Sequence, residues 1–502
     1  MGKMSKNMIS SIVSQLVTIV TGFLVQRYVL ISYGSELNGL ISFVTQILAY
    51  LVLIEAGITT ASIQALYKPI SKKNIREING ILSATKRKFI KVGCIFFLIL
   101  GISALIFPLI IGNQVSYGTV CAVTIVSGAS TGISYLYINK YQALLYADDK
   151  TGVVYNISSI SVILICILKI CLMKMGTNLV CVQAVQIIGV ICKILILSVY
   201  VNKRYREVSF DENPNNEAIN KSKNVFIHQM AGFVNNHTDV ILISTFSTLK
   251  NVSLYSVYNL IYSHLNSLMQ SAFAQAPMGF FGKKYVSNYK DFRKIYDIYE
   301  LIYTGILFVI LTAALIMTMP FIHLYTKGVT DMQYSDGVLA WLFFTAQFFN
   351  LIRVPSVLTI NVSGTFKETQ KGAIWEAIIN LGISIPLFFF IGIKGLLIGT
   401  IAAMLFRSYD VTVFTYNNII GKKILEFYKL LVVHLIPSIT LAIISQRYLG
   451  YIIINWAVWF GVSCIVVVML LTVEIILIRI FYSHKYHDTI SYMKNFVRGK
   501  KK

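Results

Sequence analysis

Six charged side chains lie deep inside long apolar stretches of this sequence, and ionic recognition is the chemistry that they offer. They are Arg27, Glu55, Asp239, Arg353, Arg407 and Asp410. A charge at the centre of a bilayer costs roughly 2.5–3.5 kcal/mol on insertion scales, so each needs a partner, a water-filled cavity or a route to the membrane surface. We therefore predict that these six residues line a cavity that binds a charged group of a substrate.

The local sequence supports this prediction for three of them. Glu55 lies eighteen residues beyond Leu37, where its apolar run begins, and is too deep to reach either surface. Asp239 ends the polar run NNHTD, which a lipid-facing helix would not tolerate. Arg353 lies in the middle of its run beside Pro355, which is expected to bend the helix there.

The other three residues allow two interpretations. Arg27 lies in the outer third of its run, where it either extends outward to the membrane surface or shares a cavity with Glu55. Arg407 and Asp410 are one helical turn apart, so they either neutralise each other or face the cavity together.

Further ionisable residues lie nearer to the ends of apolar runs. For these we expect the side chain to extend to the membrane surface or to pair there. They are Lys169, Lys193, Glu300, Glu376 and Glu474.

Motifs of enzymes and metal sites are absent from the sequence. It holds no HExxH, GxSxG or P-loop pattern, and its seven histidines are scattered. The seven cysteines lie in apolar runs without the spacing of metal ligands and are expected to act as small hydrophobic residues. We expect no enzymatic activity, no cofactor and no metal.

Transmembrane helices are the elements that would position the deep charges. The 502-residue chain is 56% hydrophobic and only 13% charged, with a mean hydropathy of +0.70, which excludes an ordinary soluble protein. Apolar runs long enough to cross a hydrocarbon core of ~30 Å recur along it. We predict an all-α polytopic membrane protein with fourteen transmembrane helices. The predicted spans are approximately 8–30, 37–67, 90–111, 119–139, 152–172, 179–201, 225–246, 252–275, 301–322, 338–362, 373–393, 396–416, 430–444 and 452–481.

The basic residues predict the orientation of these helices. The turn at 31–36 carries no Lys or Arg, whereas residues 68–91 carry eight. By the positive-inside rule, the second segment and both termini are cytoplasmic. The formal charge of +23 follows this pattern. We therefore expect contact with anionic membrane lipids and no binding of nucleic acid.

The helices are expected to form two lobes of six and a terminal pair. Residues 202–224 form a polar linker, after which VLIS at 29–32 is matched by ILIS at 241–244. Six of the eight prolines lie in or at the ends of spans, where they bend helices as in many transporters. The predicted parts are an N-lobe over 1–222, a C-lobe over 223–428, and helices 13 and 14 with a basic tail over 429–502.

The first eighty residues carry a more specific pattern: an Arg at the end of span one, YGxExNGL in the first turn and Glu-x-Gly in span two. Its members are Arg27, Tyr33, Gly34, Glu36, Asn38, Gly39, Leu40, Glu55 and Gly57. This pattern resembles the opening of polysaccharide-biosynthesis flippases of the Wzx type, in the superfamily that also holds lipid II flippases and MATE exporters.

The resemblance implies a MATE-like fold in the bacterial cytoplasmic membrane and transport by alternating access. The implied substrate is an undecaprenyl-pyrophosphate-linked oligosaccharide, moved from the inner to the outer leaflet. It also implies a cationic cavity between the lobes in which Arg27, which matches by position, meets the pyrophosphate. Arg353 and Arg407 match no part of the pattern, so their role rests on depth alone. A polysaccharide polymerase or glycosyltransferases of the same pathway are implied as partners.

Two other functions stay open at this point. A MATE-like multidrug or cation antiporter would favour acidic residues in the cavity, whereas the deep charges here are balanced. A membrane enzyme such as a polysaccharide polymerase or acyltransferase would carry a sizeable outer loop with catalytic basic residues, and no such loop is predicted.

Overall fold

The chain is a bundle of long apolar helices. The computed structural model describes residues 3–52, 55, 58–215, 238–365, 367–449 and 453–483, and these ranges contain helices and no β-strand. Eleven of the described helices are long and apolar enough to cross a membrane. The protein is therefore a multi-pass membrane protein. One of the eleven, Ile9–Val52, runs through predicted span one and the first part of predicted span two, and predicted span seven lies largely outside the described residues. The count of fourteen and the cytoplasmic termini stay predictions.

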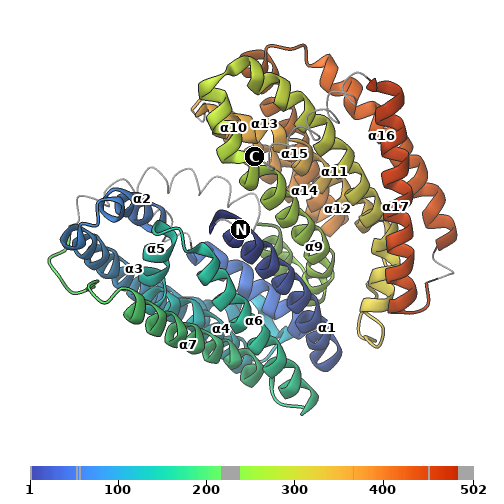
Figure 1. The fold of residues 1–502 in the computed structure, drawn as a ribbon. Coiled ribbons are helices and arrows are strands. Elements are labelled where there is room, and N and C mark those ends of the chain that lie inside the picture. The colour runs from blue at the N-terminus through green and yellow to red at the C-terminus, as the bar shows by residue number, and fades with distance from the viewer. Residues whose placement is uncertain are drawn as a thin grey trace. The chain divides into compact units, whose positions relative to one another are not determined.

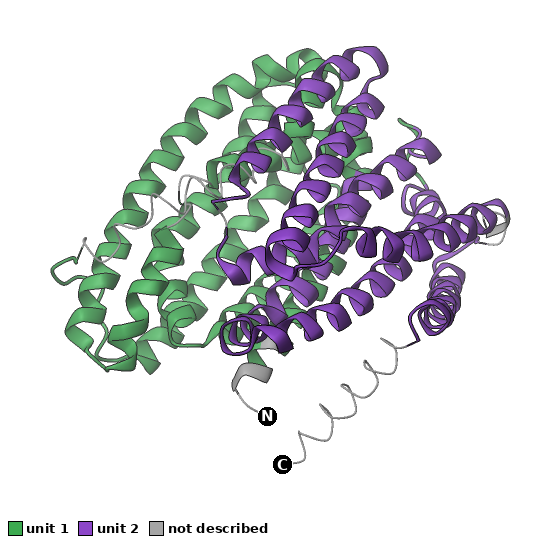
Figure 2. Cartoon of the chain, turned by 90° about the horizontal axis from the view of Figure 1, so that it is seen from above, with its two compact units in different colours: residues 1–256, 328–332 green, residues 257–327, 333–502 purple. Residues whose placement is uncertain are grey.

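The chain divides into two compact units (Figure 2). Unit 1 comprises Met1–Ser256 and Gly328–Met332, and unit 2 comprises Val257–Lys327 and Gln333–Lys502. The division falls within a single helix, α9 (Leu249–Met269). The predicted lobe boundary at 222/223 lies outside the described residues, so the assignment of three parts stays a prediction.

Unit 1 consists of α-helices that pack along one another (Figure 1). Within it, α1 packs on α6, α3 packs on α4, and α7 packs on both α4 and α6. The helices preceding α9 are α1 (Lys3–Val52), α2 (Ile58–Ser71), α3 (Ile75–Ile111), α4 (Tyr117–Tyr137), α5 (Asn139–Ala147), α6 (Thr151–Lys174) and α7 (Leu179–Arg204), with a 3-10 turn at Gly112–Gln114 and further helical residues at 238–246.

A kink at Gly34 divides α1 where a turn over residues 31–36 was predicted. Gly34 has φ 80° and ψ −179°, a conformation that side chains with a Cβ atom rarely adopt. Immediately after it, the Ser35 N–H and hydroxyl each donate a hydrogen bond of 2.8 Å to the Asp331 carboxylate. The predicted turn is therefore a sharp bend that is held by a segment from much later in the chain.

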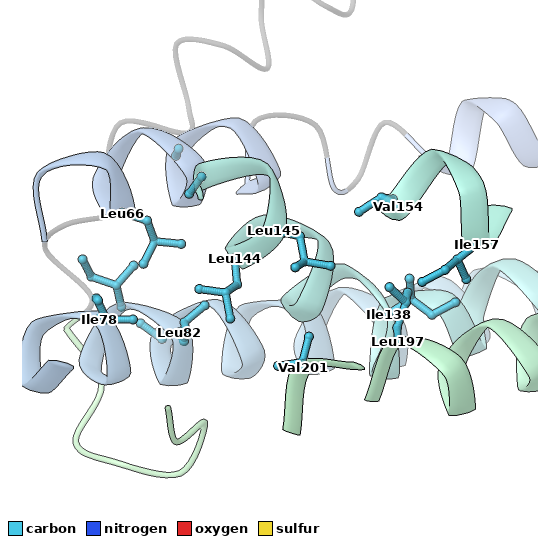
Figure 3. Packing of buried hydrophobic residues seen from close by; sticks show 14 residues of the cluster. Leu66, Ile78, Leu82, Ile138, Leu144, Leu145, Val154, Ile157, Leu197 and Val201 are labelled. Carbon is cyan, nitrogen blue, oxygen red and sulfur yellow. The ribbon is translucent and has the colours of Figure 1, made fainter. Parts of the chain in front are cut away.

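Aliphatic side chains from five helices of unit 1 form a shared core (Figure 3). Leu66 of α2, Leu82 of α3 and Leu144 of α5 are each no more than 1% exposed, and Val154 of α6 and Leu197 of α7 complete the cluster. Within a membrane such side chains stabilise the fold through close van der Waals packing between helices. The cluster holds the short helices α2 and α5 against α3.

Much of the predicted cytoplasmic loop at residues 68–91 is helical. The loop is reduced to a turn between Ser71 and Ile75, where α3 begins. Asn74 caps α3 by accepting a hydrogen bond of 3.3 Å from the Glu77 N–H. Residues 78–85 near the start of α3 are all buried, so this part of the helix packs as protein core on every side although its sequence is too polar to read as a membrane span.

Unit 2 is organised around α11, which packs on α12, α16 and α17. Its sequence has the apolar length of a long membrane helix, and most of its residues are buried. The helices following α9 are α10 (Ala276–Ser287), α11 (Tyr289–Tyr325), α12 (Gly337–Ile352), α13 (Val354–Ser363), α14 (Gln370–Ile391), α15 (Ile393–Phe414), α16 (Leu425–Leu449) and α17 (Trp456–Phe481), with π-helical turns at Gln270–Gln275 and Thr415–Ile420.

Close to the predicted bend at Pro355, the helix is interrupted by a single residue, Arg353, which separates α12 from α13. Proline has no N–H, so Pro355 cannot donate to the carbonyl oxygen of Leu351 one turn earlier. The Tyr303 hydroxyl donates to that oxygen instead, at 2.6 Å. The break therefore leaves no unsatisfied carbonyl at Leu351, and it places the Arg353 side chain at the junction of the two helices.

Candidate functional site

Three of the six predicted residues, Arg353, Arg407 and Asp410, lie together in unit 2. They are joined by Glu376, which is not one of the six. The Arg353 Nη1 donates to the Glu376 Oε1 at 2.8 Å, and the Arg407 Nε lies 3.6 Å from the Glu376 Oε2. The Arg407 Nη1 also donates to the Asp410 Oδ2 at 2.5 Å. The Glu376 carboxylate therefore lies between two guanidinium groups, and the Asp410 carboxylate binds the guanidinium group of Arg407. We call these four residues the charged cluster.

Uncharged groups hold the two arginines from their other sides. The Arg353 Nη2 donates to the Asn350 Oδ1 at 2.9 Å, and the Arg407 Nη1 donates to the Thr369 carbonyl oxygen at 3.0 Å. The Asn350 amide in turn donates to the Asn266 Oδ1 at 3.3 Å. The polar network thus extends from α15 through α14 and α12 to α9.

Backbone geometry brings these helices close enough for the cluster to form. Arg353, between α12 and α13, reaches Glu376 of α14, and Gly372 of α14 lies against the α15 side chains. A Cβ atom at Gly372 would lie 1.9 Å from the Asp410 Oδ2 and 2.4 Å from the Arg407 Nη1. A larger residue would have to displace the Asp410 and Arg407 side-chain ends, and small residues are what lets membrane helices approach each other in this way.

The charged cluster is balanced and largely shielded from solvent. Its two cations face two anions, and the side chains of Glu376 and Arg407 are 9% and 13% exposed. Arg353 at one end is 18% exposed and Asp410 at the other is 33% exposed. Charges in such a site interact strongly because little water screens them. The arrangement is chemically suited to holding an anion between two planar guanidinium groups.

The other three predicted residues lie in unit 1. Arg27 is half-buried on α1, seven residues before the Gly34 kink. Asp239 is 6% exposed, and its Oδ2 accepts a hydrogen bond of 2.8 Å from the Tyr255 hydroxyl of α9. Its neighbours at 235–237 in the predicted polar run lie outside the described residues.

Glu55 is held by uncharged donors. The Thr59 hydroxyl donates to its Oε1 at 2.7 Å, and the Asn139 side-chain amide donates to its Oε2 at 2.6 Å. Both donors belong to the α2 and α5 region rather than to the first half of α1. A cavity shared by Glu55 and Arg27 stays a prediction.

Two cavities lie apart from the predicted residues. One, of about 780 Å³ in unit 1, is lined by helix ends that include Tyr33, Gln114 and Lys250. The other, of about 510 Å³ in unit 2, is an apolar groove between the start of α16 and the end of α17. None of the six predicted residues lines either one. Within the described ranges, no group of three or more His, Cys, Asp or Glu residues is arranged to hold a metal ion.

Neither a protein-family profile nor a curated protein matches the sequence. Solved structures do match the fold. The chain is similar to the lipid II flippase MurJ in an inward closed conformation, with a TM-score of 0.69 at 15% identity, over 95% of this chain and 98% of that one. An inward-facing multidrug resistance MATE family transporter of the MOP superfamily gives 0.65 at 14% identity, over 82% and 98%. A MATE structure in a bent conformation gives 0.52 at 15% identity, over 83% and 96%.

The chain has the MurJ–MATE fold. At these identities the likeness concerns the arrangement of the helices and not the residues of a site. It agrees with the expected MATE-like architecture, and it leaves the roles of the six predicted residues as predictions.

Of the two arrangements expected for the ionisable residues near span ends, extension to the membrane surface or pairing, the structure shows pairing for four of them. Lys169, Glu300, Glu376 and Glu474 are between 4% and 7% exposed. Each has a nearby partner on another helix. The pairs are Lys169 with Gln183, Glu300 with Tyr416, Glu376 with Arg353, and Glu474 with His434. Lys193 is half-buried.

Glu376 is the residue of the charged cluster that sequence reasoning missed. It was assigned to the membrane surface because it lies close to the start of its apolar run. One signal was available: Gly372 lies one turn before Glu376, and a glycine in a membrane helix often marks a close approach to another helix. That signal indicates contact but does not identify Arg407 and Asp410 as the residues contacted.

Proposed function

We propose that this protein is a flippase that moves an undecaprenyl-pyrophosphate-linked oligosaccharide from the inner to the outer leaflet of the bacterial cytoplasmic membrane. The observation that carries the proposal is the extent of the fold match. MurJ, a lipid II flippase, is matched over 95% of this chain, whereas the MATE structures are matched over 82–83%. A match along nearly the whole of both chains favours a lipid-linked substrate over the small drugs of a multidrug transporter.

The chemistry of the deep charges supports the same proposal. A pyrophosphate carries negative charge that must stay solvated or paired while it crosses the membrane. Arginine binds such groups in a forked geometry, and Arg27, Arg353 and Arg407 are the cations proposed for this purpose. Glu55, Asp239 and Asp410 would balance them when no substrate is bound. The polyprenyl tail would stay in the bilayer, and alternating access would carry the headgroup across.

The proposed pathway places other proteins beside this one. Glycosyltransferases would build the lipid-linked oligosaccharide on the cytoplasmic side, and a polysaccharide polymerase would consume it on the outer side. These partners are part of the proposal, together with surface polysaccharide as the final product.

The decisive experiment is a deletion strain complemented with this gene. Deletion is expected to abolish the surface polysaccharide and to leave lipid-linked oligosaccharide accessible only from the cytoplasmic side. Complementation restores both. An unchanged distribution of the lipid-linked oligosaccharide in the deletion strain contradicts the proposal. Energised efflux of cationic dyes would instead indicate a multidrug antiporter, and elongation of glycan chains by the purified protein would indicate an enzyme.

Single substitutions test the cationic residues. Arg27→Ala and Arg353→Ala are each expected to reduce export by roughly tenfold or more, because one charge-assisted hydrogen bond contributes about 1.5–3 kcal/mol. Surface polysaccharide is measured at matched protein level in the membrane. Lys72→Ala, on the exposed turn between α2 and α3, serves as the control for loss of a positive charge. Normal export by both arginine variants would refute the role of these cations.

A further inference from the structure

Glu376 occupies the position that an anionic ligand of Arg353 and Arg407 would take. Its two carboxylate oxygens lie 2.8 Å from the Arg353 Nη1 and 3.6 Å from the Arg407 Nε, so one anion is shared by two guanidinium groups from different helices. Two arginines converging on one set of oxygens is the usual geometry of a phosphate site.

We propose that Glu376 is an internal competitor of the anionic ligand: it fills the site between Arg353 and Arg407 until the diphosphate group of the lipid carrier displaces it. The identity of the anion rests on the proposed function. The existence of an anion site filled by an internal carboxylate rests on the geometry of the charged cluster alone.

The arginines are held in place independently of Glu376. Asn350 binds the Nη2 of Arg353, and the Thr369 carbonyl binds the Nη1 of Arg407. Neither contact involves the carboxylate of Glu376. When Glu376 moves away, each guanidinium therefore keeps an anchor that limits its freedom, and the site does not have to be rebuilt around the incoming ligand.

Glu376 is better suited than Asp410 to be the exchanged group. Asp410 lies three residues after Arg407 on the same helix and binds that arginine alone. Glu376 reaches both arginines from α14 through a longer and more flexible side chain. Removing Glu376 would leave two cations against one anion, so the site would then attract an anion rather than stay neutral.

The two ends of the charged cluster are more exposed than its middle. The side chains of Arg353 and Asp410, at the two ends of the charged cluster, are 18% and 33% exposed, whereas that of Glu376 is 9% exposed. A diphosphate would contact Arg353 first and then compete for the shared position. Because Glu376 competes with the diphosphate, it sets the ligand concentration that binding requires, and it does not add to the affinity.

The test measures anion binding without any translocation. Purified full-length protein in nanodiscs of zwitterionic lipid is titrated with inorganic pyrophosphate in a calorimeter. Glu376→Gln is expected to bind pyrophosphate at least about tenfold more tightly than the wild type, since one charge-assisted contact no longer competes. The double variant Arg353→Ala/Glu376→Gln is expected to lose this gain. Glu474→Gln, at the buried Glu474–His434 pair of unit 2, is the matched control and leaves affinity unchanged.

A folded Glu376→Gln variant with wild-type affinity would overturn the proposal, as would an equal gain in Glu474→Gln. If Glu376→Gln does not fold, Glu376→Asp serves instead, because its shorter side chain keeps the charge but cannot span both arginines. It is expected to bind pyrophosphate about threefold more tightly, and a folded Asp variant without any gain would also overturn the proposal.

Parallel titrations identify the source of the anion, and they distinguish failure of the anion site from failure of the proposed function. Tighter binding of nanodisc-embedded undecaprenyl pyrophosphate by Glu376→Gln supports a lipid carrier, whereas a gain restricted to soluble pyrophosphate overturns that part of the proposal. If Glu376→Gln binds pyrophosphate more tightly while deletion of the gene leaves the surface polysaccharide unchanged, the proposed function is refuted and the anion site stands.

Discussion

Glu376 determines the electrostatics of the charged cluster at the scale of single residues. Without it, Arg353 would keep only the neutral Asn350 among the contacts described above. Removing one partner of a buried ion pair typically costs about 3–5 kcal/mol, because the remaining charge is left without compensation. A membrane protein keeps such a pair where the charges have a use, which is why we place the substrate's anionic group here.

Gly372 permits this arrangement, and its substitution is a direct test of the cluster's packing. Gly372→Ala would place a Cβ atom 1.9 Å from the Asp410 Oδ2, so the Arg407–Asp410 pair would have to move. We expect destabilisation of about 1–3 kcal/mol, measured as a lower midpoint of thermal unfolding in detergent.

The matched control for this prediction lies on the same helix. A Cβ atom at Gly382 of α14 would meet no other atom within 4 Å. Gly382→Ala is therefore expected to be neutral or stabilising by up to about 1 kcal/mol, the usual gain from replacing glycine within a helix. Equal effects of the two substitutions would contradict the tight packing inferred at Gly372.

At the scale of elements, helix ends and breaks direct the polar groups of unit 2. Asp336 caps α12: its Oδ1 accepts a hydrogen bond of 3.1 Å from the Leu339 N–H. Its Oδ2 lies 2.9 Å from the Lys394 Nζ, near the start of α15. At its other end, α12 stops at Ile352, three residues before Pro355. The cap and the break together set the length of α12 and so the position of Arg353.

The Asp336 cap predicts a pH dependence of stability. Burial raises the pKa of this carboxyl, but the Lys394 ammonium and the Leu339 N–H outweigh burial, so its pKa lies below the ordinary value. A folded-state pKa below the unfolded value stabilises the protein above about pH 4, and this contribution is lost as pH falls through the folded-state pKa. We expect Asp336→Asn, which keeps a capping oxygen, to lower stability by about 0.5–1 kcal/mol at pH 7.

The measurement compares wild type and variant by unfolding at several pH values. The difference between them is expected to shrink toward zero below pH 4, and to shrink at pH 7 in high salt because Lys394 is partly exposed. Asp336→Ala, which removes the cap as well as the charge, should cost more at every pH. A difference that stays constant down to acid pH would show that the charge of Asp336 is not the cause.

At the scale of the whole molecule, the distribution of basic residues predicts how the chain crosses the membrane. Basic residues concentrate in segments such as 68–91, and the structure shows that much of this segment is helical. Helical structure does not change the prediction, because the positive-inside rule depends on charge next to the span and not on local conformation.

Labelling of single cysteines tests this topology. In a variant without native cysteines, Lys72→Cys is expected to react with a membrane-impermeant maleimide only after the cells are permeabilised. Lys174→Cys, at the end of α6, is expected to react in intact cells. Both lysines are exposed, so burial does not confound the comparison. Labelling of both in intact cells, or the reverse order, would contradict the predicted orientation.

The sequence by itself determined that this is a helical membrane protein and where most of its helices lie. The predicted spans at 152–172 and 179–201 agree with α6 (Thr151–Lys174) and α7 (Leu179–Arg204) within three residues. That prediction succeeds because the bilayer imposes the same apolar length on every helix that crosses it, and this requirement is met locally. The Pro355 break was predictable for a similarly local reason, the missing N–H.

Only the tertiary structure decided which deep charges meet. Arg353 and Arg407 are 54 residues apart, and the carboxylate that joins them, Glu376, looked like a residue of the membrane surface. Pairing between helices depends on their rotation and closeness, which Gly372 and the Pro355 break set together. No property of a single helix encodes that geometry, because the energy of a buried charge depends on which partner the fold places beside it.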